Sequence, residues 1–216
     1  MKIRIILTLV AGLLAGLGPG VASAEDWRIK LFPDETDKSM QNLMTPVGAA
    51  IQIGGGVSDF TNDRMRDRTE PAGSWQVRAV IGTRSVIAGE LAYVGTAQDI
   101  TALGLDRDTT LVRNGLEAAV RFNLPIVRDE WTLEPFAFVG IGWARYDLIN
   151  DDFNTSDVRE NDDVGVVPLG GGFSVSYQNF MVDTRLTYRP TFDEDLLRGG
   201  GGSDNWAVTG ALGYQF

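Results

Sequence analysis

Charged side chains recur inside otherwise apolar segments of this chain. There they could bind a proton or an ion, or form ion pairs with one another. Within the alternating segments described below, they fall mostly on the face opposite the apolar one. They are Arg78, Glu90, Arg113, Glu117, Arg121, Glu134, Asp183, Arg185 and Arg189. Five are basic and four are acidic, so their charges nearly cancel. Because unpaired buried charges are costly, we expect a hydrogen-bonded network of ion pairs, and a narrow ion path or a catalytic constellation is the alternative.

Histidine and cysteine are both absent from the chain. Without histidine, the chain lacks the usual acid/base group near neutral pH and the commonest metal ligand. Without cysteine, it has no disulfide, thiol nucleophile or cysteine metal site. Asp183 with Arg185, or Glu90 with a neighbouring serine, could be imagined as a histidine-free site, but nothing in the spacing favours one. We therefore predict no enzyme activity and no cofactor.

The segments that would position these charges alternate apolar and polar residues from position 46 to the end of the sequence. Such alternation is typical of a β-strand with two different faces. We predict eight strands, near 46–58, 75–83, 86–96, 111–122, 131–146, 164–177, 180–190 and 205–216. The last one shows the pattern clearly, since its apolar face carries Trp206, Val208, Leu212, Tyr214 and Phe216.

The connections between these segments alternate in length. The long, polar ones are 59–74, 97–110, 147–163 and 191–204. Residues 84–85 and 178–179 form tight turns, and the third short-side connection, Asn123 to Glu130, is longer and holds Pro125. Long extracellular loops opposite short periplasmic turns, with an even strand count, are typical of bacterial outer-membrane barrels. We predict an all-β fold, a transmembrane eight-stranded antiparallel up-and-down β-barrel, and a soluble β-sandwich is the alternative.

Aromatic residues cluster at both ends of the predicted strands, as expected where a barrel meets two membrane–water interfaces. The set beside the long loops is Trp75, Tyr93, Trp143, Tyr188 and Trp206. The set at the opposite ends is Phe122, Trp131, Tyr177, Phe180, Tyr214 and Phe216. A soluble sandwich has no reason to carry aromatic residues at both rims, so these two girdles favour the barrel.

Residues 1–24 have the features of a secretory signal peptide. Lys2 and Arg4 precede an apolar stretch, and Ala22-Ser-Ala24 forms a cleavage site before Glu25. We predict that 25–45 is a periplasmic lead-in, either disordered or docked on the lower rim, and that 46–216 is the barrel. Removing residues 1–24 would leave 17 basic against 29 acidic residues, a net charge of −12. This balance argues against nucleic acid as a partner.

Two of the long loops hold candidate ligand sites. Five residues of 147–163 occupy positions 1, 3, 5, 9 and 12 of a calcium-loop frame: Asp152, Asn154, Ser156, Glu160 and Asp163. The frame lacks its glycine and its flanks are strands, so we interpret it as a solvated acidic loop, with calcium as the alternative. In 59–74, Arg64, Arg66 and Arg68 either contact lipopolysaccharide phosphates or pair with neighbouring acidic residues.

Residues 46–216 resemble the small eight-stranded outer-membrane barrels, namely the OmpA-type transmembrane domain, the OmpX/Ail type and the opacity-protein type. The strand count, the loop alternation, the segment Leu133-Glu-Pro-Phe-Ala-Phe-Val-Gly-Ile-Gly-Trp143 and the Tyr214-Gln-Phe216 ending carry this resemblance. It implies a location in the bacterial outer membrane, contact with lipid and lipopolysaccharide, and recognition of Phe216 by the barrel assembly machinery. Small barrels that are lipid A deacylases or palmitoyltransferases use a histidine, which this chain lacks.

Together these observations predict a non-enzymatic barrel that displays acidic extracellular loops for surface interaction or adhesion, with a possible protein partner at those loops. A structural membrane component without a dedicated partner is the alternative, and a narrow pore is a further one.

Overall fold

The computed structural model describes residues 28–29, 48–67, 69–100, 109–128, 130–149, 161–192 and 203–216. Its strands are β1 (Arg28–Ile29), β2 (Ala49–Phe60), β3 (Ala72–Ile81), β4 (Ile87–Asp99), β5 (Thr110–Asn123), β6 (Ile126–Arg128), β7 (Trp131–Ile149), β8 (Asn161–Val166), β9 (Leu169–Tyr177), β10 (Phe180–Arg189), β11 (Thr191–Phe192) and β12 (Asn205–Gln215). A single turn of helix, α2 (Asp63–Arg66), follows β2. No helix in the described part of the chain is long and apolar enough to cross a membrane.

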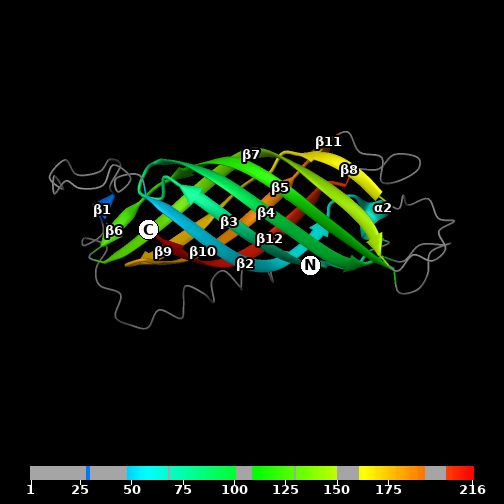
Figure 1. Cartoon of the computed structure of the whole chain (residues 1–216), viewed down its shortest axis with the longest axis horizontal. Coiled ribbons are helices and arrows are strands. Elements are labelled where there is room, and N and C mark those ends of the chain that lie inside the picture. The colour runs from blue at the N-terminus through cyan, green and yellow to red at the C-terminus, as the bar shows by residue number, and fades with distance from the viewer. Residues whose placement is uncertain are drawn as a thin grey trace.

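The strands close into a barrel of tilted antiparallel neighbours (Figure 1). Neighbours in the ring pair in chain order from β2 through β3, β4 and β5 to β7, and β12 returns to pair with β2, joining Asn205 to Phe60 and Gln215 to Ala50. β8 and β9 pair with β7 in one register, and β10 and β11 likewise form one barrel strand. The ring therefore has eight strands, which confirms the predicted fold class. Closure leaves no free edge around the barrel wall.

Prolines interrupt three of the eight barrel strands. Pro168 separates β8 from β9, Pro190 separates β10 from β11, and Pro125 separates β5 from β6. Proline has no N–H to donate to a neighbouring strand, so the ladder is interrupted at each of these positions. The register on either side is nevertheless unchanged.

The prediction of a long connection from Asn123 to Glu130 was wrong. β6 continues the pairing of β5 with β7, since Asn123 lies opposite Phe136 and Arg128 opposite Trp131. Leu124 N donates to Pro135 O at 2.9 Å across the break. The other edge of β6 pairs with β1, joining Arg28 to Val127 and Ile29 to Ile126. β1 therefore lies at the end of the barrel that carries the tight turns, at the left of Figure 1.

Side chains alternate strictly between the two faces of the wall. Apolar side chains on the outer face are largely exposed, with Ile53, Ile141 and Leu212 at 67%, 71% and 66% of their surface. Polar and charged side chains fill the inner face instead. This distribution is the reverse of a soluble domain and is that of a membrane barrel, whose outer face meets lipid.

Candidate functional site

Six of the nine predicted interior charges form one network, which we call the lower cluster: Arg78, Glu90, Arg121, Glu134, Asp183 and Arg185. Glu90 lies at its centre. Arg185 donates from Nη1 to Glu90 Oε2 at 3.0 Å and from Nη2 to Oε1 at 3.2 Å. Arg121 Nη1 donates to Glu90 Oε1 at 3.3 Å, and Arg78 Nε lies 3.4 Å from Oε2. The Glu90 carboxylate therefore contacts three guanidinium groups.

Asp183 is the second centre of the lower cluster. Arg185 Nε donates to Asp183 Oδ1 at 3.0 Å, and Arg121 Nη1 donates to Oδ2 at 3.0 Å. The Ser174 hydroxyl donates to Oδ2 at 2.9 Å. Glu134 is more loosely held, since its Oε2 lies 3.9 Å from Arg121 Nη2. β3, β4, β5, β7, β9 and β10 all contribute to this network, so it ties opposite walls of the barrel together.

The other three interior charges form the upper cluster, which consists of Arg113, Glu117 and Arg189. Arg189 donates to Glu117 from Nε at 2.6 Å and from Nη2 at 3.3 Å. Arg113 Nη2 donates to Glu117 Oε1 at 3.2 Å. All three residues are at most 5% exposed. The structure thus places all nine residues in the interior but divides them between two clusters.

The sequence analysis missed the two aromatic residues beside the lower cluster, Phe136 and Phe138. Arg121 lies over the Phe136 ring at 3.7 Å from its centre, and Arg185 lies 5.0 Å from the rings of Phe136 and Phe138. Cation–π contact of this kind stabilises a guanidinium that is removed from water. Phe136 and Phe138 lie two and four residues after Glu134, so the strand period alone would have placed them on the inner face.

An apolar cap lies in the barrel at the end opposite the tight turns. It consists of Phe60, Met65, Ile100, Leu111, Ala144, Tyr146, Val164 and Val166. Every member is at most 3% exposed. Met65 comes from α2, so the connection between β2 and β3 folds inward over the mouth. Two charged clusters and this apolar cap thus occupy the described interior, which favours a plug over a water-filled path.

The aromatic residues of the tight-turn end face outward and contact one another. The ring centres of Trp131 and Tyr177 lie 4.6 Å apart. Those of Phe180 and Tyr214 lie 5.7 Å apart, and those of Tyr214 and Phe216 5.2 Å apart. Phe122 is 49% exposed on the same outer surface. This row marks one membrane interface.

The aromatic residues of the opposite end also face outward. Tyr93 Oη donates to Asn114 at 2.7 Å, and Tyr188 Oη donates to Asp204 at 2.9 Å. Tyr188 lies opposite Trp206 in the sheet. Trp75 and Trp143 are 39% and 49% exposed. Phe192, which the sequence analysis did not include, extends this row, because Gly165 lies between it and Trp143 in register.

The wall changes from apolar to polar directly above this second row. On the outer face, the next row toward the end with the cap consists of Asn114, Arg145 and Asp163, which lie in register across β5, β7 and β8. Arg145 Nε donates to Asp147 Oδ1 at 3.0 Å, and its Nη1 lies 3.9 Å from Asp163 Oδ2. The hydrogen bond that Arg145 donates to Asp147, and the charges of both carboxylates, raise the pKa of Arg145 above its usual value. Lipid contact therefore ends between Trp143 and Arg145.

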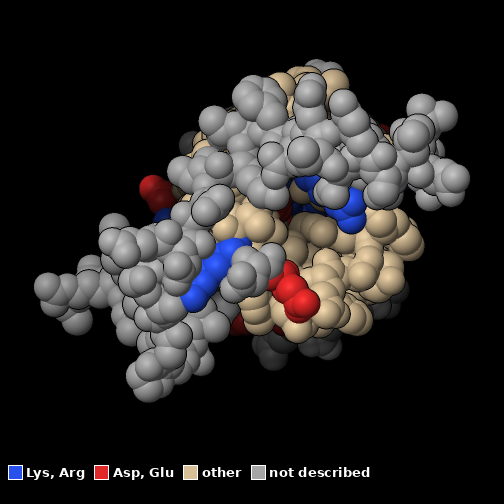
Figure 2. Space-filling view, turned by 90° about the vertical axis from the view of Figure 1, so that its left-hand side faces the viewer, with Lys and Arg blue, Asp and Glu red and all other residues tan. Residues whose placement is uncertain are grey.

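A closed barrel with an apolar outer belt between two aromatic rows is an integral outer-membrane protein of the Gram-negative type. The end with the tight turns and the C-terminus faces the periplasm, and the end with the cap faces the cell exterior. Figure 2 shows the periplasmic end, where described basic and acidic side chains lie among uncharged ones. The described charges there are Arg84, Arg128 and Glu130.

The extracellular rim is predominantly acidic. Its described carboxylates are Asp59, Asp63, Asp67, Glu70, Asp99, Asp147, Asp162, Asp163 and Asp204. The basic side chains described there, Arg66 and Arg145, already lie near carboxylates: Arg66 Nε is 3.8 Å from Asp59 and its Nη1 is 4.0 Å from Asp63. For Arg66 this arrangement favours local pairing over lipopolysaccharide. Arg68 and the Arg64 side chain lie outside the described residues.

The predicted calcium frame falls mostly outside the described part of the chain. Asp152, Asn154, Ser156 and Glu160 are not described, and Asp163 lies beside Arg145. Within the described ranges, no group of three or more acidic, histidine or cysteine side chains could hold a metal ion.

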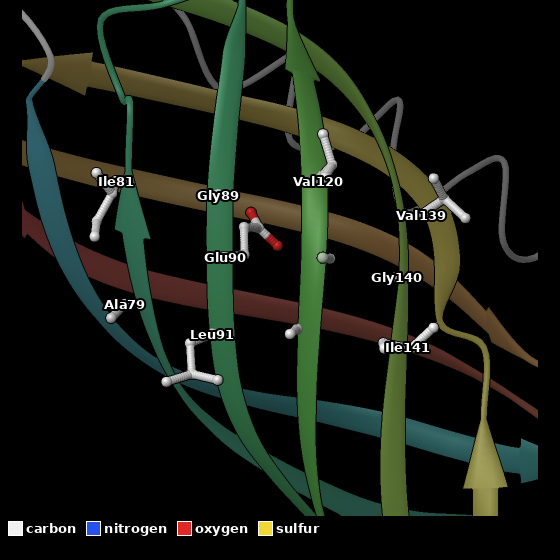
Figure 3. A pocket seen from close by; sticks show the side chains of 11 residues that line it. Ala79, Ile81, Gly89, Glu90, Leu91, Val120, Val139, Gly140 and Ile141 are labelled. Atoms are coloured by element: carbon white, nitrogen blue, oxygen red, sulfur yellow. The ribbon is translucent and has the colours of Figure 1, made fainter.

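The lipid-facing wall carries a shallow hollow of about 650 Å³ (Figure 3). Small residues, Ala79, Gly89 and Ala118, alternate there with Ile81, Leu91, Val120 and Ile141 on β3, β4, β5 and β7. The hollow lies between the two aromatic rows, so it is a feature of the surface that meets hydrocarbon.

Comparisons with known proteins agree on architecture only. No family model matches the chain, and no curated protein matches it. Among solved structures, it is similar to Ail, the attachment invasion locus protein of Yersinia pestis, with 14% identity, a TM-score of 0.47, and coverage of 78% of this chain and 98% of that one. Neisserial surface protein A matches with 10% identity and a TM-score of 0.47, covering 78% and 96%.

The N-terminal β-barrel domain of Pseudomonas aeruginosa OprF matches with 12% identity and a TM-score of 0.44, covering 77% of this chain and 97% of that one. Similarity at this level does not transfer the role of any of these proteins to this chain.

Proposed function

We propose that this protein is a non-enzymatic surface interaction protein whose acidic extracellular rim binds a basic protein partner. The main support for this proposal is the position of the rim. β5 and β7 stay paired beyond the outer aromatic row, from Trp143 to Ile149 on β7. Six further residues of strand extend by about 20 Å along the strand. Recognition surfaces in rigid barrels are placed in such projecting segments.

The interior supports the same proposal. Its charged side chains are engaged with one another, and the apolar cap separates them from the extracellular side. A substrate or ion that crosses the barrel would have to displace both. A partner that binds at the rim, in contrast, meets exposed groups without disturbing the plug.

The negative charge of the rim indicates that its partner is basic. Exposed carboxylates on β4, β7 and β8 (Asp99, Asp147 and Asp163) lie on the outward face of the projection. Complementary potentials steer association and choose partners by sign, so a surface rich in Lys and Arg fits this rim. Binding of this kind weakens as salt screens the charges.

The test is capture of the full-length mature protein from gently solubilised outer membranes and from intact cells mixed with candidate partners. We expect a stoichiometric basic protein, lost above physiological salt and lost with the triple substitution Asp99→Asn, Asp147→Asn, Asp163→Asn. The matched control is Glu130→Gln at the periplasmic end, which should retain the partner. Recovery of only phospholipid and lipopolysaccharide in all samples would contradict the proposal and favour a purely structural role.

A further inference from the structure

The buried charges of the barrel do not balance where they lie. The lower cluster has three guanidinium groups and three carboxylates, so it is neutral. The upper cluster has two guanidinium groups, on Arg113 and Arg189, and one carboxylate, on Glu117. The whole excess of one positive charge therefore belongs to the upper cluster. A charge removed from water without a counter-charge raises the free energy of the folded state.

The hydrogen bonds locate this excess on Arg113. Arg189 binds both oxygens of Glu117, whereas Arg113 binds one of them through Nη2 alone. Arg113 Nε and Nη1 have no hydrogen-bond partner among the described residues, although Arg113 is only 2% exposed. Three N–H bonds of a charged group are thus directed into the barrel without an acceptor, which buried donors rarely tolerate.

Two hydroxyl groups lie in the same row as Arg113. Thr96 is directly opposite Arg113 on β4, and Ser74 is directly opposite Thr96 on β3. Thr96 is 7% exposed, and the buried Ser74 Oγ likewise has no partner among the described residues. Thr96 therefore neighbours both Arg113 and Ser74, with Cβ atoms about 5 Å apart in each pair, so it can share a ligand with either. Guanidinium and hydroxyl donors together suit an anion.

From this geometry we infer that the upper cluster binds a monovalent inorganic anion of the halide class, such as chloride, between Arg113 and the hydroxyls of Thr96 and Ser74. One negative charge neutralises the interior, whereas phosphate would overcompensate it. The apolar cap above the cluster excludes a carboxylate carried by a large ligand. The bound anion becomes a fourth member of the upper cluster and stabilises the plug.

The experiment follows thermal unfolding of the full-length mature protein in detergent micelles while chloride replaces gluconate at constant ionic strength. A ligand that binds only the folded state raises the unfolding temperature as its concentration exceeds Kd. We expect such a rise with chloride and with bromide. In crystals grown with bromide, we expect one anomalous peak beside Arg113 in the interior.

Three variants make the result specific. Arg113→Gln removes the excess charge and should abolish the chloride dependence. Thr96→Val keeps all three ion-pair partners and should shift the dependence to several-fold higher chloride. Arg145→Gln removes an exposed guanidinium and should leave it unchanged. If Arg113→Gln fails to fold, Thr96→Val and the bromide peak still test the inference.

Equal unfolding temperatures in chloride and gluconate, with no interior bromide peak, would overturn the inference and assign the free donors to ordered water. A chloride dependence that persists in Arg113→Gln would also overturn it, because the anion would then act elsewhere.

Discussion

At the scale of single residues, shared carboxylates hold the interior together. Glu117 accepts hydrogen bonds from Arg113 and Arg189, and Glu90 contacts three guanidinium groups. Because each carboxylate neutralises more than one cation, its loss leaves several buried charges without compensation. The exposed ion pair of Arg145 and Asp147 has no such leverage, since water solvates both partners.

Glu117→Gln should therefore destabilise the barrel strongly while keeping its shape. Loss of one partner from a buried ion pair costs about 3–5 kcal/mol in the free energy of unfolding. Urea unfolding in lipid vesicles, followed by tryptophan fluorescence, measures this change. Asp147→Asn is the matched control and should change stability little. Equal stability of the two variants would show that the interior ion pairs contribute nothing net.

A second residue-scale prediction concerns the glycine beneath Trp75. A Cβ at Gly95 would overlap the Trp75 ring, whereas a Cβ at Gly89 on the same strand would meet open space. Gly95→Ala should displace the ring from the aromatic row and cost about 1–3 kcal/mol. Gly89→Ala should be neutral or slightly stabilising. Quenching of tryptophan by brominated lipid reports the ring's depth, and identical quenching in both variants would contradict the prediction.

At the scale of strands, the closing seam between β2 and β12 depends on close backbone approach. A Cβ at Gly56 would overlap the Val208 carbonyl oxygen, so one of the two strands would have to move. Gly56→Ala should lower the fraction of protein that migrates as the compact form on an unheated denaturing gel. Gly73→Ala on β3, where a Cβ meets nothing within 4 Å, is the control. A compact fraction equal in both variants would show that the seam adapts.

The sequence predicted the strands better than their interruptions. Alternation with period two assigns a face to each residue, which is why eight strands and an apolar outer belt could be predicted. Pro125 was assigned to the connection from Asn123 to Glu130, yet β6 continues the pairing of β5 beyond it. The pairing of β6 with the distant Arg28–Ile29 leaves no local signal in the sequence.

The partners in each ion pair also could not be predicted from the sequence. Alternation assigns Glu90 and Arg185 to one face but does not say that they meet, since they lie 95 residues apart on β4 and β10. Which interior residues meet across a barrel depends on the tilt and stagger of its strands. The division into a neutral lower cluster and a positively charged upper one follows from that stagger.

At the scale of the whole molecule, the lower cluster, the upper cluster and the apolar cap lie one above another between the periplasmic and extracellular ends. An ion crossing the barrel would have to pass the cap, whose members are at most 3% exposed, and then separate Glu117 from Arg189. An eight-stranded barrel has an interior just wide enough for its own side chains. The barrel should therefore separate its two ends electrically.

We accordingly predict that the full-length protein, reconstituted in planar bilayers, gives no unit conductance above that of the bare membrane. The same preparation after heat denaturation is the control, because it shows whether any current comes from a contaminating porin that survives heating. Reproducible steps that disappear on heating would contradict the prediction. Such steps would mean that the ion pairs of Glu90 and Glu117 exchange partners fast enough for ions to pass, and that the rim is the mouth of a channel rather than a binding surface.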